Sequence, residues 1–304
     1  MSVLVVGSFI TDFVGRCAKA PVAGESVVGK SFNTYPGGKG ANQAVACARM
    51  GSKTYMAGCV GDDLFGENFI NIFKNEGFDT KYIKVAKGAS TGASIVTVED
   101  SGQNRIVMTP GANLVYSTKD VDELEEVLNE VSYCVSQAEQ TEEVLDYLVE
   151  KCKAHNVKFI YNPAPARHIS DKTLKGLYLI TPNETELGVI IGKEVVTDEE
   201  FTSGAKELLA KGVENVVVTL GTRGCLFVNK DETTIIPAYK VKAVDTVGAG
   251  DSFTGSLAAS LDQGKTLKEA LKISNAVGAL EVQKNGAIPA MPYKKEVEEF
   301  LKNK

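Results

Sequence analysis

This chain of 304 residues lacks the marks of several protein classes. Its only histidines are His155 and His168, which excludes a zinc site of clustered histidines, and a Ser-His-Asp triad would depend on one of them. No basic tract stands out among 33 basic and 39 acidic residues, and the net charge of −6 argues against nucleic acid or an anionic membrane as the main partner. No apolar run approaches the roughly 18 residues of a membrane span.

The six cysteines are scattered without a C-x-x-C pair, which is typical of small core residues in a reducing compartment rather than of a disulfide framework. The N-terminus has no basic region of a signal peptide, because Met1 and Ser2 lead directly into the apolar residues 3–6. Hydrophobic residues make up 43% of the chain, enough for a core that needs neither disulfides nor metals. We therefore expect a cytoplasmic globular protein.

Short apolar runs alternate with segments of helical periodicity. The expected buried strands are residues 3–6, 55–60, 133–136, 157–161, 177–180 and 216–220. The expected helical faces are residues 65–73 before Gly77, residues 121–131, and residues 205–209 before Gly212. This alternation predicts an α/β fold with a doubly wound, mostly parallel central sheet flanked by helices.

Two stretches, residues 13–36 and about 89–111, have the pattern of strands and turns without a helix. In the second, the apolar runs 94–98 and 105–108 flank residues 99–102 (E-D-S-G), a hairpin signal. The two stretches predict a small separate β-sheet attached to one main domain that spans residues 1–304.

A glycine-rich run, residues 245–251 (D-T-V-G-A-G-D), precedes a segment of helical periodicity. Backbone N–H groups at the start of a helix, together with the helix dipole, favour bound phosphate. Asp251 in the first turn could take a proton from an alcohol that attacks phosphorus, while the glycine-run amides hold the developing charge. The simpler interpretation is that Asp251 only caps the helix.

A second glycine run, residues 36–42 (P-G-G-K-G-A-N), opens another helix, where a tight turn with close packing is the simpler interpretation. Neither run is an ordinary nucleotide fingerprint. Gly40 follows Lys39 where a Walker motif needs Ser or Thr, and Phe253 stands in place of the third glycine of G-x-G-x-x-G. A Walker-type NTPase, a protein kinase and a dinucleotide-dependent oxidoreductase are therefore disfavoured.

Together, ordered segments of the chain resemble the ribokinase family of sugar and nucleoside kinases over essentially its whole length. They are residues 37–43 (G-G-K-G-A-N-Q), 162–167 (N-P-A-P-A-R), 181–186 (T-P-N-E-T-E), 219–224 (T-L-G-T-R-G) and 245–251. The resemblance implies a ribokinase-like fold in which the small β-sheet is a lid. It also implies transfer of the γ-phosphoryl group of ATP to the 5-hydroxyl of a pentose, with ribose as the first choice.

The resemblance assigns roles to individual residues. Asp251 is expected as the catalytic base beside an anion hole of Gly248, Ala249 and Gly250. The expected sugar ligands are Asp12, Gly38, Lys39, Asn42, Glu139 and Asp251. The expected ATP ligands are Asn183, Glu186, Thr219, Leu220, Gly221, Thr222, Arg223, Gly224, Gly250 and Asn275, with Glu186 also binding Mg²⁺ through water.

Simpler interpretations exist for four of these residues. Asn183 and Glu186 have the spacing of a capping box at the start of a helix. Glu139 could be an exposed loop carboxylate, and Asp12 an ordinary turn residue after the first strand.

The resemblance further implies an activating monovalent cation, usually K⁺, bound mostly through backbone carbonyls. Its expected ligands are Asp245, Val247, Glu281, Lys284, Gly286 and Ala290. Ala290 departs from the family pattern, in which a serine hydroxyl often contributes. A homodimer that pairs two lids is also expected, because it would cover the exposed edge of the lid sheet.

Ile10 is the departure that bears on the substrate. Family members that prefer ribose commonly have an asparagine two residues before Asp12, whereas kinases of 2-deoxyribose have an apolar residue there. One lost hydrogen bond changes the preference by about 1 kcal/mol. Ribose stays the first expectation and 2-deoxyribose a close second, ahead of fructose or a nucleoside. A non-catalytic sugar-binding regulator on a kinase scaffold is disfavoured because Asp251 and the glycine run are retained.

Overall fold

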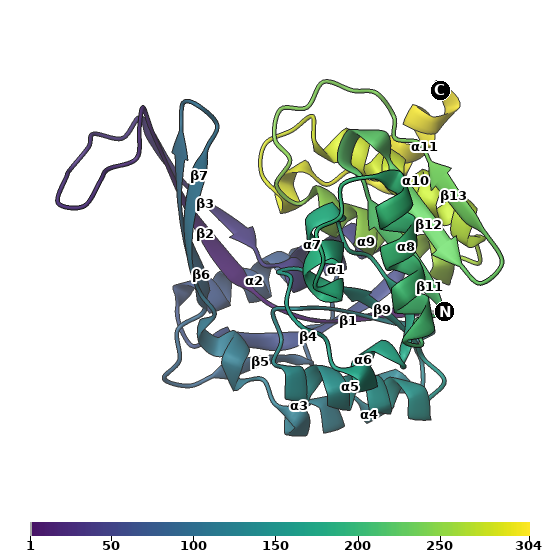
Figure 1. Ribbon diagram of the computed structural model, residues 1–304. Helices are drawn as coiled ribbons and strands as arrows, with labels where there is room; N and C mark the ends of the chain where they lie inside the picture. Colours follow the sequence, from purple (N-terminus) through teal and green to yellow (C-terminus); the bar gives the residue numbers. More distant parts are fainter. Residues whose placement is uncertain (1) are drawn as a thin grey trace.

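The computed structural model describes residues 2–304, and Figure 1 shows a layered body from which a smaller sheet projects. The body is built on nine strands in the order β13-β12-β11-β10-β9-β8-β1-β4-β5. Strands from β11 to β5 pair in parallel, and β12 and β13 add an antiparallel edge. The strands are β1 (Ser2–Val6), β4 (Lys53–Gly61), β5 (Ile83–Ala86), β8 (Tyr133–Gln137), β9 (Lys158–Asn162), β10 (Leu177–Ile180), β11 (Asn215–Thr219), β12 (Cys225–Asn229) and β13 (Thr233–Ile236).

Helices cover both faces of this sheet. One face carries α3 (Thr118–Asp122), α4 (Glu125–Leu128), α5 (Glu142–Ala154), α6 (Asp171–Leu174), α7 (Glu184–Ile191) and α8 (Asp198–Ala210). The other carries α1 (Lys39–Arg49), α2 (Leu64–Asn75), α9 (Ala249–Asp262), α10 (Leu267–Glu281) and α11 (Lys294–Lys302). Short 3₁₀ turns are η1 (Gly111–Val115), η2 (Gly221–Arg223) and η3 (Ile288–Ala290).

Strand β1 shows why the buried strands have continuous apolar runs. Leu4 and Val6 pack into the core on one face, while Val3 and Val5 pack into the core on the other. Successive side chains of a strand point to opposite faces, so a sheet covered on both sides needs apolar residues at every position. The predicted doubly wound sheet is confirmed.

The second sheet has the strand order β3-β2-β6-β7, with β2 (Ile10–Cys17), β3 (Ser31–Gly37), β6 (Gly92–Glu99) and β7 (Asn104–Thr109). Strands β2 and β6 pair in parallel between two antiparallel pairs, which confirms the predicted small separate sheet. It begins earlier than the predicted residue 13, because only residues 7–9 separate β1 from β2. Asp12 therefore lies inside a strand, and the turn interpretation is wrong.

The predicted helix over residues 121–131 is divided into α3 and α4, with Val131 after them. Val121, Leu124 and Leu128 nevertheless enter one core, so two short helices satisfy the spacing that predicted one. Nowhere in residues 2–304 is a helix long and apolar enough to cross a membrane.

Candidate active site

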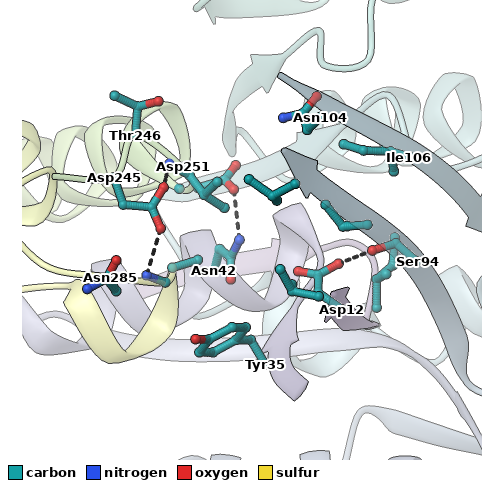
Figure 2. A pocket seen from close by; sticks show the side chains of 18 of the residues that line it. Asp12, Tyr35, Asn42, Ser94, Asn104, Ile106, Asp245, Thr246, Asp251 and Asn285 are labelled. Carbon is teal, nitrogen blue, oxygen red and sulfur yellow. Dashed lines mark hydrogen bonds between the residues drawn. The ribbon is translucent and has the colours of Figure 1, made fainter. Parts of the chain in front are cut away.

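A cavity of about 560 Å³ lies between the lid, the start of α1 and the start of α9. Every residue predicted to bind the sugar lines this cavity: Asp12, Gly38, Lys39, Asn42, Glu139 and Asp251. Figure 2 shows the side chains of Asp12 and Ser94 from the lid on one side of it and those of Asn42 and Asp251 from the body on the other. Segments far apart in the sequence thus meet around one space.

Asp251 lies in the first turn of α9 and is buried. Its Oδ2 accepts a hydrogen bond from Nδ2 of Asn42 at 2.9 Å, and its Oδ1 accepts one from Nε2 of Gln43 at 2.9 Å. The carboxylate is therefore held by two consecutive side chains of α1 (Figure 2 shows the first bond), and simple helix capping does not describe its contacts.

The start of α9 requires a glycine. Gly248 is the N-cap with φ of +93°, and a Cβ there would lie 2.8 Å from Cβ of Ala287. Both the left-handed backbone and this close approach favour glycine. The N-cap provides no side-chain hydrogen bond, and the N–H groups of Gly248 and Gly250 have no acceptor among the described residues, so they keep their capacity to bind an anion. The N–H of Ala249 already donates to the Thr246 carbonyl at 3.4 Å.

Gly38 has the same role at the start of α1. Its φ is +89°, and a Cβ there would lie 2.7 Å from the backbone N of Ile10. A side chain would push the helix away from the lid strand, so glycine is what allows Lys39 and Asn42 to reach the cavity beside β2.

The lid contributes alternate residues of its strands. Ile10, Asp12, Val14 and Arg16 of β2 all line the cavity, as the period of two requires. The Ser94 hydroxyl donates a hydrogen bond to Asp12. Ser94, Tyr35, Asn104 and Asn285 also line the cavity and were not predicted from the sequence.

Glu139 is half-buried rather than exposed in a loop. It accepts hydrogen bonds from the Ser8 hydroxyl and, at 3.1 Å, from the backbone N–H of Lys39. Ser8 was missed, although its place directly after the first strand is a sequence signal for the carboxyl edge of the sheet.

The charges of the cavity influence one another. The negative charge of Asp251 raises the pKa of Lys39 against the effect of burial, and Glu139, Glu186 and Asp12 add to this. Burial raises the pKa of Asp12, opposed by the Ser94 hydroxyl, and burial also raises the pKa of Glu139. Lys39 is thus held as a cation among carboxyl groups.

The residues predicted to bind ATP do not line this cavity. Most of them follow the carboxyl ends of β10 and β11, whereas Gly250 lies on α9 and Asn275 on α10. Asn183 and Glu186 form a capping box at the start of α7, with both bonds at 2.8 Å. Thr219 forms a β-bridge with Asn183 and leads through Leu220 into η2, which holds Gly221, Thr222 and Arg223 and ends at Gly224.

Two of these residues have additional partners. Arg223 forms ion pairs with Glu184 at 2.9 Å and Asp198 at 2.5 Å. Asn275 of α10 donates hydrogen bonds to the backbone carbonyls of Ile236 and Pro237, each at 3.1 Å. Ion pairs and hydrogen bonds of Arg223 and Asn275 therefore hold the residues predicted to bind ATP in place.

The predicted cation ligands surround the loop before α9. Oδ2 of Asp245 accepts the N–H of Gly286 at 3.0 Å, and Oδ1 accepts the N–H of Val247 at 3.1 Å. Lys284 forms an ion pair with Glu296 at 3.1 Å on the surface, and Ala290 is buried in η3.

Glu281 is the exception among these ligands because its side chain has no partner. It is 0% exposed, and both of its carboxylate oxygens lack a hydrogen bond within residues 2–304. A Cβ on Gly248 would lie 3.0 Å from Oε1 of Glu281, so the carboxyl group lies behind the start of α9. Burial, with the charges of Asp245 and Asp251, raises the pKa of Glu281 to about 9.

A metal site made of acidic, histidine and cysteine side chains is a separate question. Within the described 2–304 range, no group of three or more such residues could hold a metal ion.

Comparison with known proteins places these features in a family. Residues 1–294 match the family described as "pfkB family carbohydrate kinase". The chain is 35% identical over 299 residues to a ribokinase of Haemophilus influenzae, with 98% of each chain covered. It is 34% identical over 302 residues to a deoxyribokinase of Salmonella typhi, with 99% of each covered. The structure of Arabidopsis thaliana ribokinase complexed with ribose and ATP superposes with a TM-score of 0.94 at 29% identity, covering 99% of this chain and 98% of that one.

Proposed function

Because this chain belongs to the pfkB family of carbohydrate kinases, we propose that it transfers the γ-phosphoryl group of ATP to O5 of D-ribose. One observation carries the proposal: Asp251, the uncapped start of α9 and the predicted sugar ligands all border a single cavity. A base, a set of anion-binding amides and a sugar site must meet in this way for a hydroxyl to be phosphorylated.

The sugar binds between the lid and the body. Asp12 from β2 and Asn42 from α1 accept and donate hydrogen bonds to its hydroxyls, and Lys39, Gly38 and Glu139 complete the site. Asn42 suits this role because its Oδ1 is buried without a hydrogen-bond partner among the described residues. The sugar would supply that partner.

Asp251 takes the proton from the attacking hydroxyl. The transfer is in line, and no covalent phosphoenzyme is needed. Gly248, Ala249 and Gly250 form the anion hole, in which amides of the first turn of α9 hold the charge of the phosphoryl group. Lys39 adds a positive charge on the same cavity wall.

ATP lies over the residues that follow β10 and β11, with Gly250 of α9 and Asn275 of α10 completing the site. The residues after the strands are Asn183, Glu186, Thr219, Leu220, Gly221, Thr222, Arg223 and Gly224. Glu186 suits a water of Mg²⁺, because its capping bond uses Oε2 and leaves Oε1 available. Mg²⁺, when bound, neutralises charge on the triphosphate.

Glu281 supports the proposed K⁺ site. A buried carboxyl group without a partner is costly, and a cation between the loop of Asp245 and Val247 and the segment of Lys284, Gly286 and Ala290 would satisfy it. A bound K⁺ supplies positive charge behind the anion hole. The departure at Ala290 is compatible with this site, because the backbone carbonyl remains.

We also propose a homodimer formed through the lid. The two sides of β7 carry exposed apolar residues: Ile106, 57% exposed, lines the cavity, and its neighbour Val107 is 67% exposed. Neighbours along a strand face opposite sides, so each lid face is partly apolar. Pairing with a second lid would remove such surface from water.

Ile10 makes 2-deoxyribose the second candidate. It is 4% exposed and lines the cavity at the base of the lid, where it offers no hydrogen bond to a sugar hydroxyl. The similarity to the Salmonella typhi deoxyribokinase is nearly as high as that to the ribokinases, which adds weight to this candidate.

The test is ATP turnover by the purified protein on D-ribose and on 2-deoxy-D-ribose, with K⁺ and Mg²⁺ present. A preference for ribose supports the proposal, and a preference for 2-deoxyribose transfers it to the second candidate. Turnover of neither sugar rejects both substrate assignments.

A further inference from the structure

A chain of buried side-chain amides lies behind Asp251. Gln43 is fully buried and does not line the cavity. Its Nε2 donates to Oδ1 of Asp251 at 2.9 Å and to Oδ1 of Asn162 at 3.1 Å. Its Oε1 accepts a hydrogen bond from Nε2 of Gln137 at 2.8 Å. Both the nitrogen and the oxygen of the Gln43 side-chain amide thus form hydrogen bonds within the protein.

The groups at the two ends of this row of amides, the Asp251 carboxylate and the Thr181 carbonyl, determine which atom donates in each bond. A carboxylate and a backbone carbonyl only accept hydrogen bonds. Asn162 donates through Nδ2 to the carbonyl of Thr181 at 3.1 Å, so it turns Oδ1 toward Gln43. Gln43 must therefore present Nε2 to Asn162 and Asp251 together, and the network has one consistent orientation.

We propose that Gln43 is a positioning residue for phosphoryl transfer, which fixes the rotation of the Asp251 carboxylate. Its bond and that of Asn42 occupy one lone pair on each carboxylate oxygen, so the remaining lone pairs keep one direction for the incoming hydroxyl. The inference rests on the proposed role of Asp251 as the base. Gln43 is not among the residues proposed to bind the sugar or ATP, so this role is additional to theirs.

Asn42 and Gln43 are neighbours with different tasks. Asn42 lines the cavity and keeps Oδ1 without a partner, so it can also bind the sugar. Gln43 does not line the cavity. Loss of Gln43 should therefore change the rate of the chemical step and leave substrate binding intact.

The test compares three variants. Gln43→Met keeps the length of the side chain and removes its polar atoms, and kcat should fall about 10- to 100-fold with KM for sugar and ATP within about twofold. Gln137→Met removes only the support behind Gln43, so a smaller fall in kcat is expected. The control is Asn215→Leu, which removes a buried amide that donates to the Tyr178 carbonyl at 2.9 Å, at the amino end of β11. It should lower the melting temperature without changing kcat.

The outcomes separate a positioning role from a structural one. A fall in kcat for Gln43→Met, with Asn215→Leu unchanged, supports the inference. An unchanged kcat in Gln43→Met, or an equal fall in Asn215→Leu, overturns it. If Gln43→Met does not fold, Gln137→Met decides in the same way.

A failure of the proposed function shows itself separately. Turnover is measured on whichever sugar the unmodified protein phosphorylates, so a wrong choice of pentose does not affect the comparison of variants. If Asp251→Asn retains full turnover, the role of the base is wrong, whatever the Gln43 variants do.

Discussion

Asp251 and Asn42, which are 209 positions apart in the chain, are joined by a hydrogen bond of 2.9 Å from Nδ2 to Oδ2. The bond connects the starts of α9 and α1, the two helices that open with glycine runs. Each run is a weak signal alone. Their convergence on one carboxylate is what makes the cavity a candidate active site.

Asp251→Asn should lower kcat by about 10²- to 10⁴-fold, the range for loss of a general base. The KM for the sugar should change less than kcat, because the other predicted sugar ligands remain in the cavity. A coupled assay of ADP formation measures both constants. Asp262→Asn is the matched control, since Asp262 is a buried acid at the other end of α9, and it should retain activity.

Ile10→Asn should shift the ratio of kcat/KM for ribose over 2-deoxyribose toward ribose by about 5- to 10-fold, the effect of about 1 kcal/mol. The new amide would lie at the base of the lid, where it can bind a hydroxyl that 2-deoxyribose lacks. The control is Ile106→Asn, because Ile106 lines the same cavity farther along the lid. It should leave the ratio unchanged. Equal shifts in both variants would contradict a specific contact at residue 10.

K⁺ should raise the melting temperature of the protein by about 5 °C in the absence of substrates, relative to choline at the same ionic strength. Glu281→Gln should remove most of this shift, because the buried carboxylate that the cation satisfies is gone. The control is Glu269→Gln, at the other end of α10, which should keep the K⁺-dependent rise in melting temperature. A full K⁺ shift in Glu281→Gln would show that its side chain takes no part.

The lid dimer should be visible as twice the chain mass in light scattering at micromolar concentration. Ile106→Glu and Val107→Glu place a charge on opposite faces of β7, so the variant that yields a monomer identifies the paired face. Val196→Glu, at a residue 69% exposed on the body, should leave the mass unchanged. A monomer in the unmodified protein excludes the dimer.

Sequence patterns predicted the central sheet well because both of its faces are covered. Continuous apolar runs such as Val3–Val6 have few alternatives to a buried strand. The break between α3 and α4 was not predictable, since the spacing of Val121, Leu124 and Leu128 fits one helix or two. The early start of β2 was also missed, because Gly7 and Ser8 before it and Asp12 within it are residues that favour turns.

Within the site, the predicted sugar ligands were assigned through the family resemblance, and all of them line the cavity. Ser94 and Tyr35 could not be found in this way, because ordinary residues of lid strands acquire a role only through the pairing of β2 with β3 and β6. Gln43 belongs to the glycine motif of residues 37–43, but its contact with Asp251 depends on the packing of α1 against α9, which the motif does not reveal.

The partition of the cavity between lid and body has a consequence for how such an enzyme can be altered. Asp12 and Ile10 belong to β2, whereas Asp251 and its amide partners belong to the body. The residue proposed to set the sugar preference, Ile10, and the proposed base therefore lie on different parts of the structure. A lid grafted from a relative, joined at residues 10 and 37 and at residues 92 and 109, should therefore change the contacts made by Ile10 and Asp12 and leave Asp251 and its amide partners unaltered.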